Sequence, residues 1–290
     1  MITDWDVTDL PSARLLGTFV SGSPEWHELR SQGVGGSQVG TVLGLNPWES
    51  AFTLWAKTCG LLDDRESSLA MRAGSFFERP IKEFWLQENP GFEILETGTW
   101  QSKVHEFAHA NPDGILRAAD GSLSILEIKT SRYPWNEIPP HYKAQVLWYM
   151  AVLGIHKGKL VAWVSGSEFH EYDIEWDQFE ADAQFTTVKR WWDCVGSGEQ
   201  PEWDGSTSTY ETVRVLHPDI DADGVVDLGE LGVALVNAQS DADAAQALLT
   251  ELKSRTLDAM GNAKTAVVDD HVVATRSARN GGTPFLTIKK

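Results

Sequence analysis

Apolar and polar residues alternate most clearly between positions 123 and 128, which read Leu-Ser-Ile-Leu-Glu-Ile. This short run is rich in β-branched and large apolar side chains and predicts a β-strand. Residues 115–116 predict the end of a second strand, and the turn-forming residues at 119–122 connect the two. The pattern therefore indicates a β-hairpin.

Within this hairpin, Glu127 and Lys129 are two positions apart. Side chains alternate between the two faces of a strand, so these two share one face, and Leu126 and Ile128 enter the core on the other. A carboxylate and an ammonium group are thus expected to leave the sheet side by side.

The other elements follow from the spacing of apolar residues along the chain. Helical spacing predicts helices at 23–30, 46–62, 68–88, 141–153, 177–195 and 234–260. The stretch 33–44 is predicted as a glycine-rich turn that leads into a short helix. Strand patterns recur at 92–100, 107–110, 159–164, 168–176 and 211–216, with a hairpin at 267–290. Pro80 is expected to kink or restart its helix just after Glu78 and to turn that acid inward. The order strand, strand, helix around Glu127 is the order that an α/β core requires.

The chain has 290 residues, enough for one large domain with an appendage. Its composition changes after the Gly/Ser-rich segment 196–198. We predict a main domain at 1–205 and a C-terminal helix and hairpin at 206–290. The end of this appendage carries the basic residues Arg276, Arg279, Lys289 and Lys290. They suit a DNA or subunit contact and equally a solvated tail.

Charge and composition narrow the function classes. The net charge of −18 argues against DNA binding when taken alone, because Lys and Arg supply affinity for phosphates, although a local basic groove would suffice. Cys59 and Cys194 are too few for a four-cysteine metal cluster. No apolar run reaches the roughly 18 residues of a membrane span and no basic-apolar leader opens the chain. We therefore expect a soluble cytoplasmic protein without a membrane partner, located in the host cytoplasm if a phage encodes it.

The hairpin can also bring Asp113 beside Glu127. The two carboxylates would then repel each other unless a cation lies between them. Two carboxylates beside a lysine suit Mg²⁺, with Mn²⁺ as the alternative, holding an activated water against a phosphodiester. The competing interpretation is an ordinary hairpin with a charged outer face and a type I turn at 112–114. His105 and His109 are four apart on a predicted strand, do not converge on one metal there and are interpreted as ordinary polar positions.

The motif Pro112-Asp113, a gap, then Glu127-Ile128-Lys129 resembles the signature of the PD-(D/E)XK nucleases. Further matches resemble its lambda-exonuclease-like or YqaJ-type viral recombinase branch. The resemblance implies an α/β, restriction-endonuclease-like core with a central mixed β-sheet flanked by helices. It also implies that Asp113, Glu127 and the Ile128 carbonyl bind metal and that Lys129 is catalytic.

The further matches extend the implied site. Glu78, in a Gly-x-x-x-Glu pattern, resembles the additional acid that completes the metal site or orients the water. Gln145 and Tyr149 match a Gln and a Tyr packed against the active site, and Gln145 is included among the catalytic residues. Arg30 and Ser37 match residues that bind the 5′-terminal phosphate of DNA, although the glycine-rich turn alone favours a plain tight turn. Asp usually follows this serine, and the Gln38 found here puts the helix capping in doubt.

The activity implied is a Mg²⁺-dependent exonuclease that digests the 5′-ended strand of linear double-stranded DNA during phage-type recombination. The resemblance also implies a homotrimer that encircles DNA, and a single-strand annealing protein is a candidate partner. Two alternatives remain at this stage. One is a structure- or site-specific DNA endonuclease with the same metal site. The other is a non-catalytic protein that binds DNA ends, or that binds a partner in a calcium-dependent way.

Residues 219–230 fit the template of an EF-hand calcium loop, with acids at positions 1, 3, 5, 9 and 12 and glycine at position 6. However, 211–216 is predicted as a strand and Pro218 interrupts the incoming side. We therefore favour an acidic turn before a helix over a Ca²⁺ site.

Overall fold

The computed structural model describes residues 1–20, 22–63 and 68–289, which form two compact units, Met1–Asp219 and Ile220–Lys290. The first unit ends later than position 205 because α7 (Thr207–Leu216) packs on α3 (Ala51–Thr58). The Thr53 hydroxyl lies 2.8 Å from the hydroxyl oxygens of both Ser208 and Thr212. Helix α7 is therefore part of the first unit.

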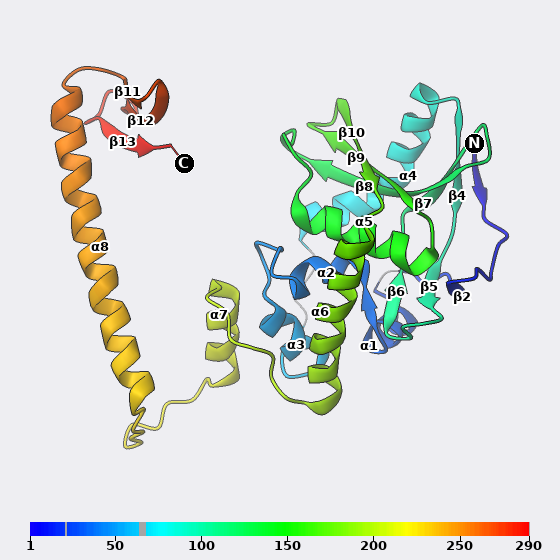
Figure 1. Ribbon diagram of the computed structural model, residues 1–290, viewed down its shortest axis with the longest axis horizontal. Helices are drawn as coiled ribbons and strands as arrows, with labels where there is room; N and C mark the ends of the chain where they lie inside the picture. Colours follow the sequence, from blue (N-terminus) through cyan, green and yellow to red (C-terminus); the bar gives the residue numbers. More distant parts are fainter. Residues whose placement is uncertain (21, 64–67, 290) are drawn as a thin grey trace. The chain divides into compact units, whose positions relative to one another are not determined.

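The core of the first unit is a six-stranded mixed sheet (Figure 1). Its strands, in spatial order, are β1 (Ile2–Asp4), β4 (Phe92–Glu96), β7 (Gly114–Ala118), β8 (Leu123–Ser131), β9 (Lys157–Val164) and β10 (Glu168–Glu175). β7 and β8 form the predicted hairpin, with Gly114 opposite Leu126, whereas β8 and β9 are parallel. Parallel neighbours need a crossover connection, and α5 (Pro140–Leu153) supplies it.

Helices cover both faces of this sheet (Figure 1). On β8, Leu126 and Ile128 pack in one cluster with Ile81 and Trp85 of α4 (Leu69–Glu88). Ile125 packs in the other cluster, which contains the buried residues of α5. The remaining helices of this unit are α1 (Pro24–Ser31), α2 (Gly36–Val42) and α6 (Gln178–Ser197). The predicted α/β core, a central mixed sheet flanked by helices, is confirmed.

A second, four-stranded sheet was not predicted. Its order is β2 (Ala13–Gly17), β5 (Thr99–Ser102), β6 (Ala108–Ala110) and β3 (Val34–Gly35). β3 is parallel to β6 and leads directly into α2. This sheet thus fixes the start of the glycine-rich segment in space.

The predicted restart of the helix at Pro80 is wrong, because α4 continues through Pro80 from Leu69 to Glu88. Proline removes one backbone donor and displaces the carbonyl four residues earlier, that of Phe76. Phe76 is exposed, so water can hydrate that carbonyl. The exposed surface of the helix therefore tolerates the proline without a break.

The strand predicted at 211–216 is also wrong, because this segment is the second half of α7. Its β-branched residues favour a strand locally, but Ser206 caps the helix by accepting a hydrogen bond from the Thr209 backbone N–H. Thr209 and Thr212 are both buried, at a helical spacing of three. Helices therefore flank the acidic loop on both sides, and the strand is no argument against calcium.

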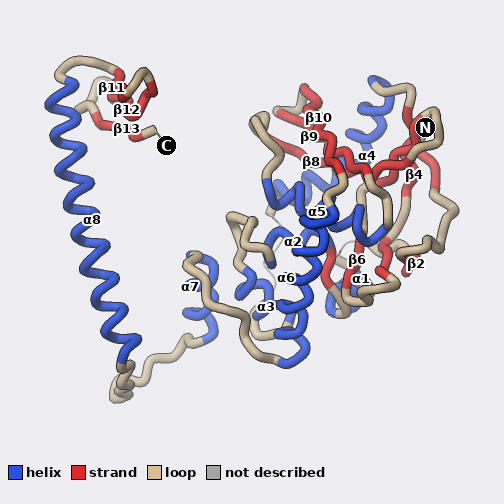
Figure 2. The backbone as a smooth tube through the Cα atoms, viewed as in Figure 1, coloured by secondary structure: helices blue, strands red, loops and turns tan. Residues whose placement is uncertain are grey.

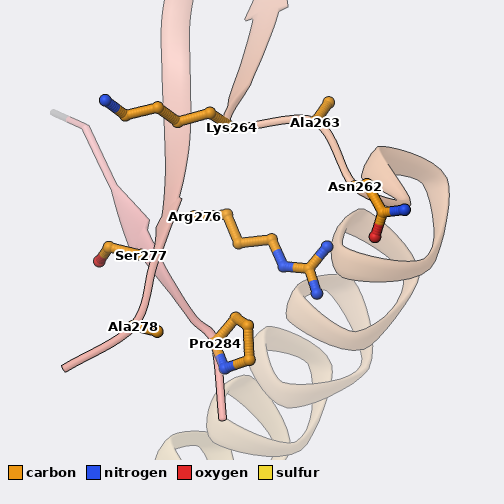
Figure 3. A pocket seen from close by; sticks show the side chains of 7 residues that line it. All are labelled: Asn262, Ala263, Lys264, Arg276, Ser277, Ala278 and Pro284. Carbon is orange, nitrogen blue, oxygen red and sulfur yellow. The ribbon is translucent and has the colours of Figure 1, made fainter. Parts of the chain in front are cut away.

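The second unit consists of α8 (Glu230–Met260) and a three-stranded sheet (Figure 2). The sheet contains β11 (Thr265–Val268), β12 (His271–Ser277) and β13 (Phe285–Ile288). β12 and β13 form the predicted hairpin, and β11 is an additional strand. A pocket of about 280 Å³ lies beside this sheet, and the side chains of Lys264 and Arg276 line part of it (Figure 3). None of the predicted nuclease-site residues lines this pocket.

Within the described ranges, no helix is long and apolar enough to cross a membrane.

His109 on β6 is buried, and its Nε2 atom has no hydrogen-bond partner among the described residues. Burial lowers the pKa of this imidazole to about 4. Between pH 6.5 and 4 the unfolded chain therefore binds a proton that the folded chain does not, and folding loses stability as the pH falls.

As the pH falls from 7 to 4, we expect this difference in proton binding at His109 to lower the free energy of unfolding by about 3 kcal/mol. Urea denaturation at several pH values, with His109→Gln as the non-titrating reference, measures this contribution. The difference between wild type and variant should change by that amount over the interval. A difference independent of pH would contradict the expectation.

Candidate active site

The β7–β8 hairpin brings Asp113 against the backbone of β8. Asp113 immediately precedes β7, and its Oδ2 atom accepts a hydrogen bond of 2.7 Å from the Ile128 N–H. The carboxylate is therefore held at the backbone of the residue between Glu127 and Lys129. The expected meeting of Asp113 with the Glu-x-Lys motif is present in the structure.

Glu127 lies at the centre of the site and is 2% exposed. Its Oε1 atom accepts hydrogen bonds from Lys129 Nζ at 2.5 Å and from Gln145 Nε2 at 2.6 Å. Its Oε2 atom is buried and has no hydrogen-bond partner among the described residues. Buried carboxylate oxygens are normally paired, so this oxygen is available for a further positive ligand.

Gln145 holds Glu127 from α5. The two hydrogens of its amide reach Glu127 and, at 3.0 Å, the Tyr149 hydroxyl oxygen. Gln145 and Tyr149 are both buried. The polar position on the apolar face of this helix is therefore explained by its hydrogen bonds.

The third acid, Glu78, comes from α4, where Gly74, Glu78 and Lys82 lie on one face at a spacing of four. A Cβ at Gly74 would lie 3.7 Å from the Thr130 Oγ1 atom, so this face runs along β8. Lys82 Nζ donates to Glu78 Oε1 at 2.5 Å. The site thus contains a second lysine, which the sequence analysis did not identify.

These charges strongly affect one another. Burial and the neighbouring carboxylates of Glu127 and Glu78 raise the pKa of Asp113 well above its usual value, although Lys129 and Lys82 partly offset this. Burial likewise raises the pKa of Glu127, against the opposing effect of Lys129. Burial lowers the pKa of Lys129, but Glu127 and Asp113 raise it more, so its pKa lies above the usual value. The two carboxylates are therefore costly to ionise, while the lysine stays protonated at neutral pH.

This donor set fits a hard divalent cation. A cation beside Asp113 and Glu127 would relieve their repulsion and pair the buried Glu127 Oε2 atom. In the part of the chain that the structure describes, no three His, Cys, Asp or Glu side chains converge closely enough to hold a metal ion. Lysines hold two of the three acids instead, Lys129 on Glu127 and Lys82 on Glu78.

The predicted phosphate-binding residues lie on α1 and α2. Ser23 caps α1, as predicted, and the Arg30 guanidinium lies 4.5 Å from the centre of the Trp26 ring. Ser37 is exposed in the first turn of α2. Gln38 Oε1 accepts a hydrogen bond of 3.0 Å from the Gly35 N–H, so glutamine preserves the capping that its presence put in doubt.

Tyr149 connects the glycine-rich segment to the acidic site. A Cβ at Gly36 would lie 2.3 Å from the Tyr149 ring, so α2 can approach α5 this closely only with glycine there. The charge of Arg30 also acts on the pKa of Tyr149, against the larger effects of burial and Glu127, which raise it. Arg30 and Glu127 are therefore both near enough to Tyr149 for their charges to act on its hydroxyl group.

We expect Gly36→Ala to lower the free energy of unfolding by about 1–3 kcal/mol, because the Tyr149 ring cannot move without breaking its contact with Gln145. Gly91→Ala is the matched control, since nothing lies within 4 Å of a Cβ there. Urea denaturation of both variants measures the effect. Equal stability of the two variants would show that the Tyr149 ring can move away from a Cβ at position 36 without loss of stability.

Comparison with known proteins links this site to a family. The profile of the YqaJ-like viral recombinase domain matches residues 25–156, a span that contains every residue of the site. The chain is 32% identical over 215 residues to YqaJ of Bacillus subtilis (strain 168), covering 70% of this chain and 66% of that protein. It is 38% identical over 114 residues to a protein of African swine fever virus, covering 37% of this chain and 32% of that one. The chain thus spans less than two thirds of either curated relative.

Among solved structures, the alkaline exonuclease LHK-Exo of Laribacter hongkongensis superposes with a TM-score of 0.51 at 20% sequence identity. The match covers 61% of this chain and 94% of that one. At this identity the likeness concerns the fold. The restriction-endonuclease-like architecture expected from the sequence is confirmed.

Proposed function

Because residues 25–156 belong to the YqaJ-like viral recombinase family, we propose that this chain is a metal-dependent deoxyribonuclease that digests the 5′-ended strand of linear double-stranded DNA. The observation that carries the proposal is the end of the β7–β8 hairpin. There Asp113 and Lys129 lie close to Glu127, and the buried Oε2 atom of Glu127 lacks a partner among the described residues. The name of LHK-Exo, an alkaline exonuclease, supports the same reaction class.

Asp113, Glu127 and the Ile128 carbonyl would hold the ion, with Mg²⁺ as the expected metal and Mn²⁺ as the alternative. When bound, it would supply an activated water and neutralise charge on the phosphodiester. Glu78 would support a second ion or the attacking water. Gln145 keeps Glu127 oriented through its hydrogen bond of 2.6 Å.

Lys129 stays protonated beside Glu127, which favours an electrostatic role over that of a base. Its ammonium group would orient the water and stabilise negative charge on the phosphate oxygens. In the reaction the water oxygen bonds to phosphorus, the bond from phosphorus to the 3′-oxygen breaks, and the leaving oxygen gains a proton. The products are a 5′-mononucleotide and a shortened strand.

The 5′ end would be recognised by Arg30 and Ser37, which bind its terminal phosphate. The Tyr149–Gln145 pair connects this region to Glu127, so the distance from the strand end to the cleaved bond is set by packed residues. Such a local site is compatible with the net charge of −18, because binding of one terminal phosphate requires only a few nearby cations.

We further propose that the nuclease domain predicted at 1–205 also includes α7, and that the rest of the predicted appendage 206–290, α8 and its three-stranded sheet, contacts DNA or another subunit. The family resemblance favours a homotrimer around the DNA and a single-strand annealing protein as partner. Light scattering of the purified chain measures the oligomer, and a monomeric mass at micromolar concentration would contradict the trimer.

The test of function compares a linear duplex with 5′-phosphate ends, the same duplex with 5′-hydroxyl ends and a covalently closed circle, each with and without Mg²⁺. We expect nucleotide release from the linear duplexes only, faster with the 5′-phosphate and absent without the ion. Cutting of the circle would instead indicate an endonuclease. No hydrolysis of any substrate would favour a non-catalytic DNA-end-binding or calcium-dependent protein.

A further inference from the structure

Lys82 is buried at 4% exposure, in the middle of α4. Lysine is almost never buried to this degree unless it is paired. Its Nζ atom lies 2.5 Å from Glu78 Oε1, and Glu78 itself is only partly buried. An exposed pair at this helical spacing would contribute only a few tenths of a kcal/mol, so helix stabilisation alone does not account for the burial.

The packing of α4 keeps the ammonium group inside. Ile81, the preceding residue, and Trp85, almost one turn later, are buried against Leu126 and Ile128 of β8. These contacts anchor the helix to the strand that carries Glu127 and Lys129. Lys82 is therefore held next to the site by the same contacts that position Glu78.

Lys82 also acts on the other two acids. Its positive charge opposes the rise in the pKa of Asp113 and Glu127 that burial and neighbouring carboxylates cause. With all five groups ionised, Glu78, Asp113 and Glu127 against Lys82 and Lys129 leave one net negative charge. Without Lys82 the same group would carry two, which a single divalent cation would balance.

We propose that Lys82 is a positioning residue that holds Glu78 when no divalent ion is bound and competes with that ion for it. This inference rests on the proposed metal-dependent function. Lys82 then acts as an internal counter-ion, which limits repulsion among the acids in the metal-free chain and weakens cation binding. Release of Glu78 from Lys82 accompanies metal binding.

The experiment is calorimetric titration of Mn²⁺ into the full chain, without DNA. Lys82→Met removes the charge while keeping an unbranched side chain of similar length, and we expect it to bind Mn²⁺ at least about tenfold more tightly. Lys82→Arg keeps the charge and should bind as the wild type does. Lys159→Met is the matched control, because Lys159 is a partly buried lysine on β9 whose ion pairs, with Asp173 at 2.7 Å and Glu171 at 3.2 Å, are with residues of β10.

Equal or weaker Mn²⁺ binding by Lys82→Met, with the wild type binding normally, would overturn the competition and leave the proposed function intact. Absence of binding by both wild type and variant would overturn the metal site, and the competition with it. Circular dichroism checks that each variant is folded. If Lys82→Met does not fold, Lys82→Gln carries the same test, since it keeps a donor towards Glu78 without the charge.

Discussion

Replacing Lys129 with alanine is expected to slow nucleotide release from a linear 5′-phosphorylated duplex by about a thousandfold. The substitution removes the ammonium group 2.5 Å from Glu127 Oε1, where the proposed reaction would develop negative charge on the phosphate. A protonated lysine at that place stabilises the transition state more than the bound substrate. The loss should therefore fall on kcat, measured under saturating DNA and Mg²⁺, with little change in KM.

Lys143→Ala is the control for charge alone. Lys143 lies on α5 and pairs with Glu180 at 2.6 Å, with its side chain 45% exposed. Its removal changes the net charge of the chain by the same amount as removal of Lys129, and we expect activity to stay within about threefold. If Lys129→Ala retained activity within tenfold of the wild type, Lys129 would have no catalytic role.

The centre of the site could be predicted because its geometry is local. Period-two alternation alone places Glu127 and Lys129 on one face of β8, and a short turn closes the hairpin that brings in Asp113. Gln145 was recognisable as a polar residue on an apolar helical face that needed a partner. In each case the information lies within one element or between neighbours in sequence.

The remaining parts depend on contacts that sequence spacing does not contain. The spacing of Glu78 and Lys82 is visible, but the burial of Lys82 follows from the packing of Trp85 on a distant strand. The contact of Gly36 with Tyr149 likewise joins two helices far apart in the chain.

The small second sheet was missed for the same reason. β6 lies within the strand predicted at 107–110, but β3 has only two residues, too few to show alternation. Their parallel pairing joins segments far apart in the chain, so the pattern of one strand does not reveal it. The helix α7 was missed because Thr and Val favour strands, whereas burial of Thr209 and Thr212 against α3 decides the outcome.

The raised pKa of Asp113 implies that the acidic site destabilises the metal-free chain. Burial and the carboxylates of Glu127 and Glu78 disfavour ionised Asp113 in the folded state, whereas the unfolded chain ionises it freely. Stability is therefore lost as the pH rises from about 4 through the folded-state pKa of Asp113. Near neutral pH, Asp113 therefore makes the folded chain less stable than it is at pH 4.

Asp113→Asn should accordingly raise the free energy of unfolding of the metal-free chain by about 1–3 kcal/mol at pH 7.5, while abolishing Mg²⁺-dependent hydrolysis. The asparagine carbonyl can still accept the hydrogen bond from the Ile128 N–H, so the hairpin is preserved. Near pH 4 the gain should vanish, because the wild-type carboxyl is then protonated. Urea denaturation at both pH values, in the presence of a chelator, measures the difference.

Saturating Mn²⁺ should reverse the order of stability, because the ion binds the folded wild type and not Asp113→Asn. That result would mean that Lys82 and Lys129 offset the buried acids only in part, and that the proposed ion supplies the remaining stabilisation. A variant that is less stable than the wild type at pH 7.5 without metal would show that Lys82 and Lys129 already compensate the buried charge. In that case the two lysines, and not a cation, would balance the acids of the resting site.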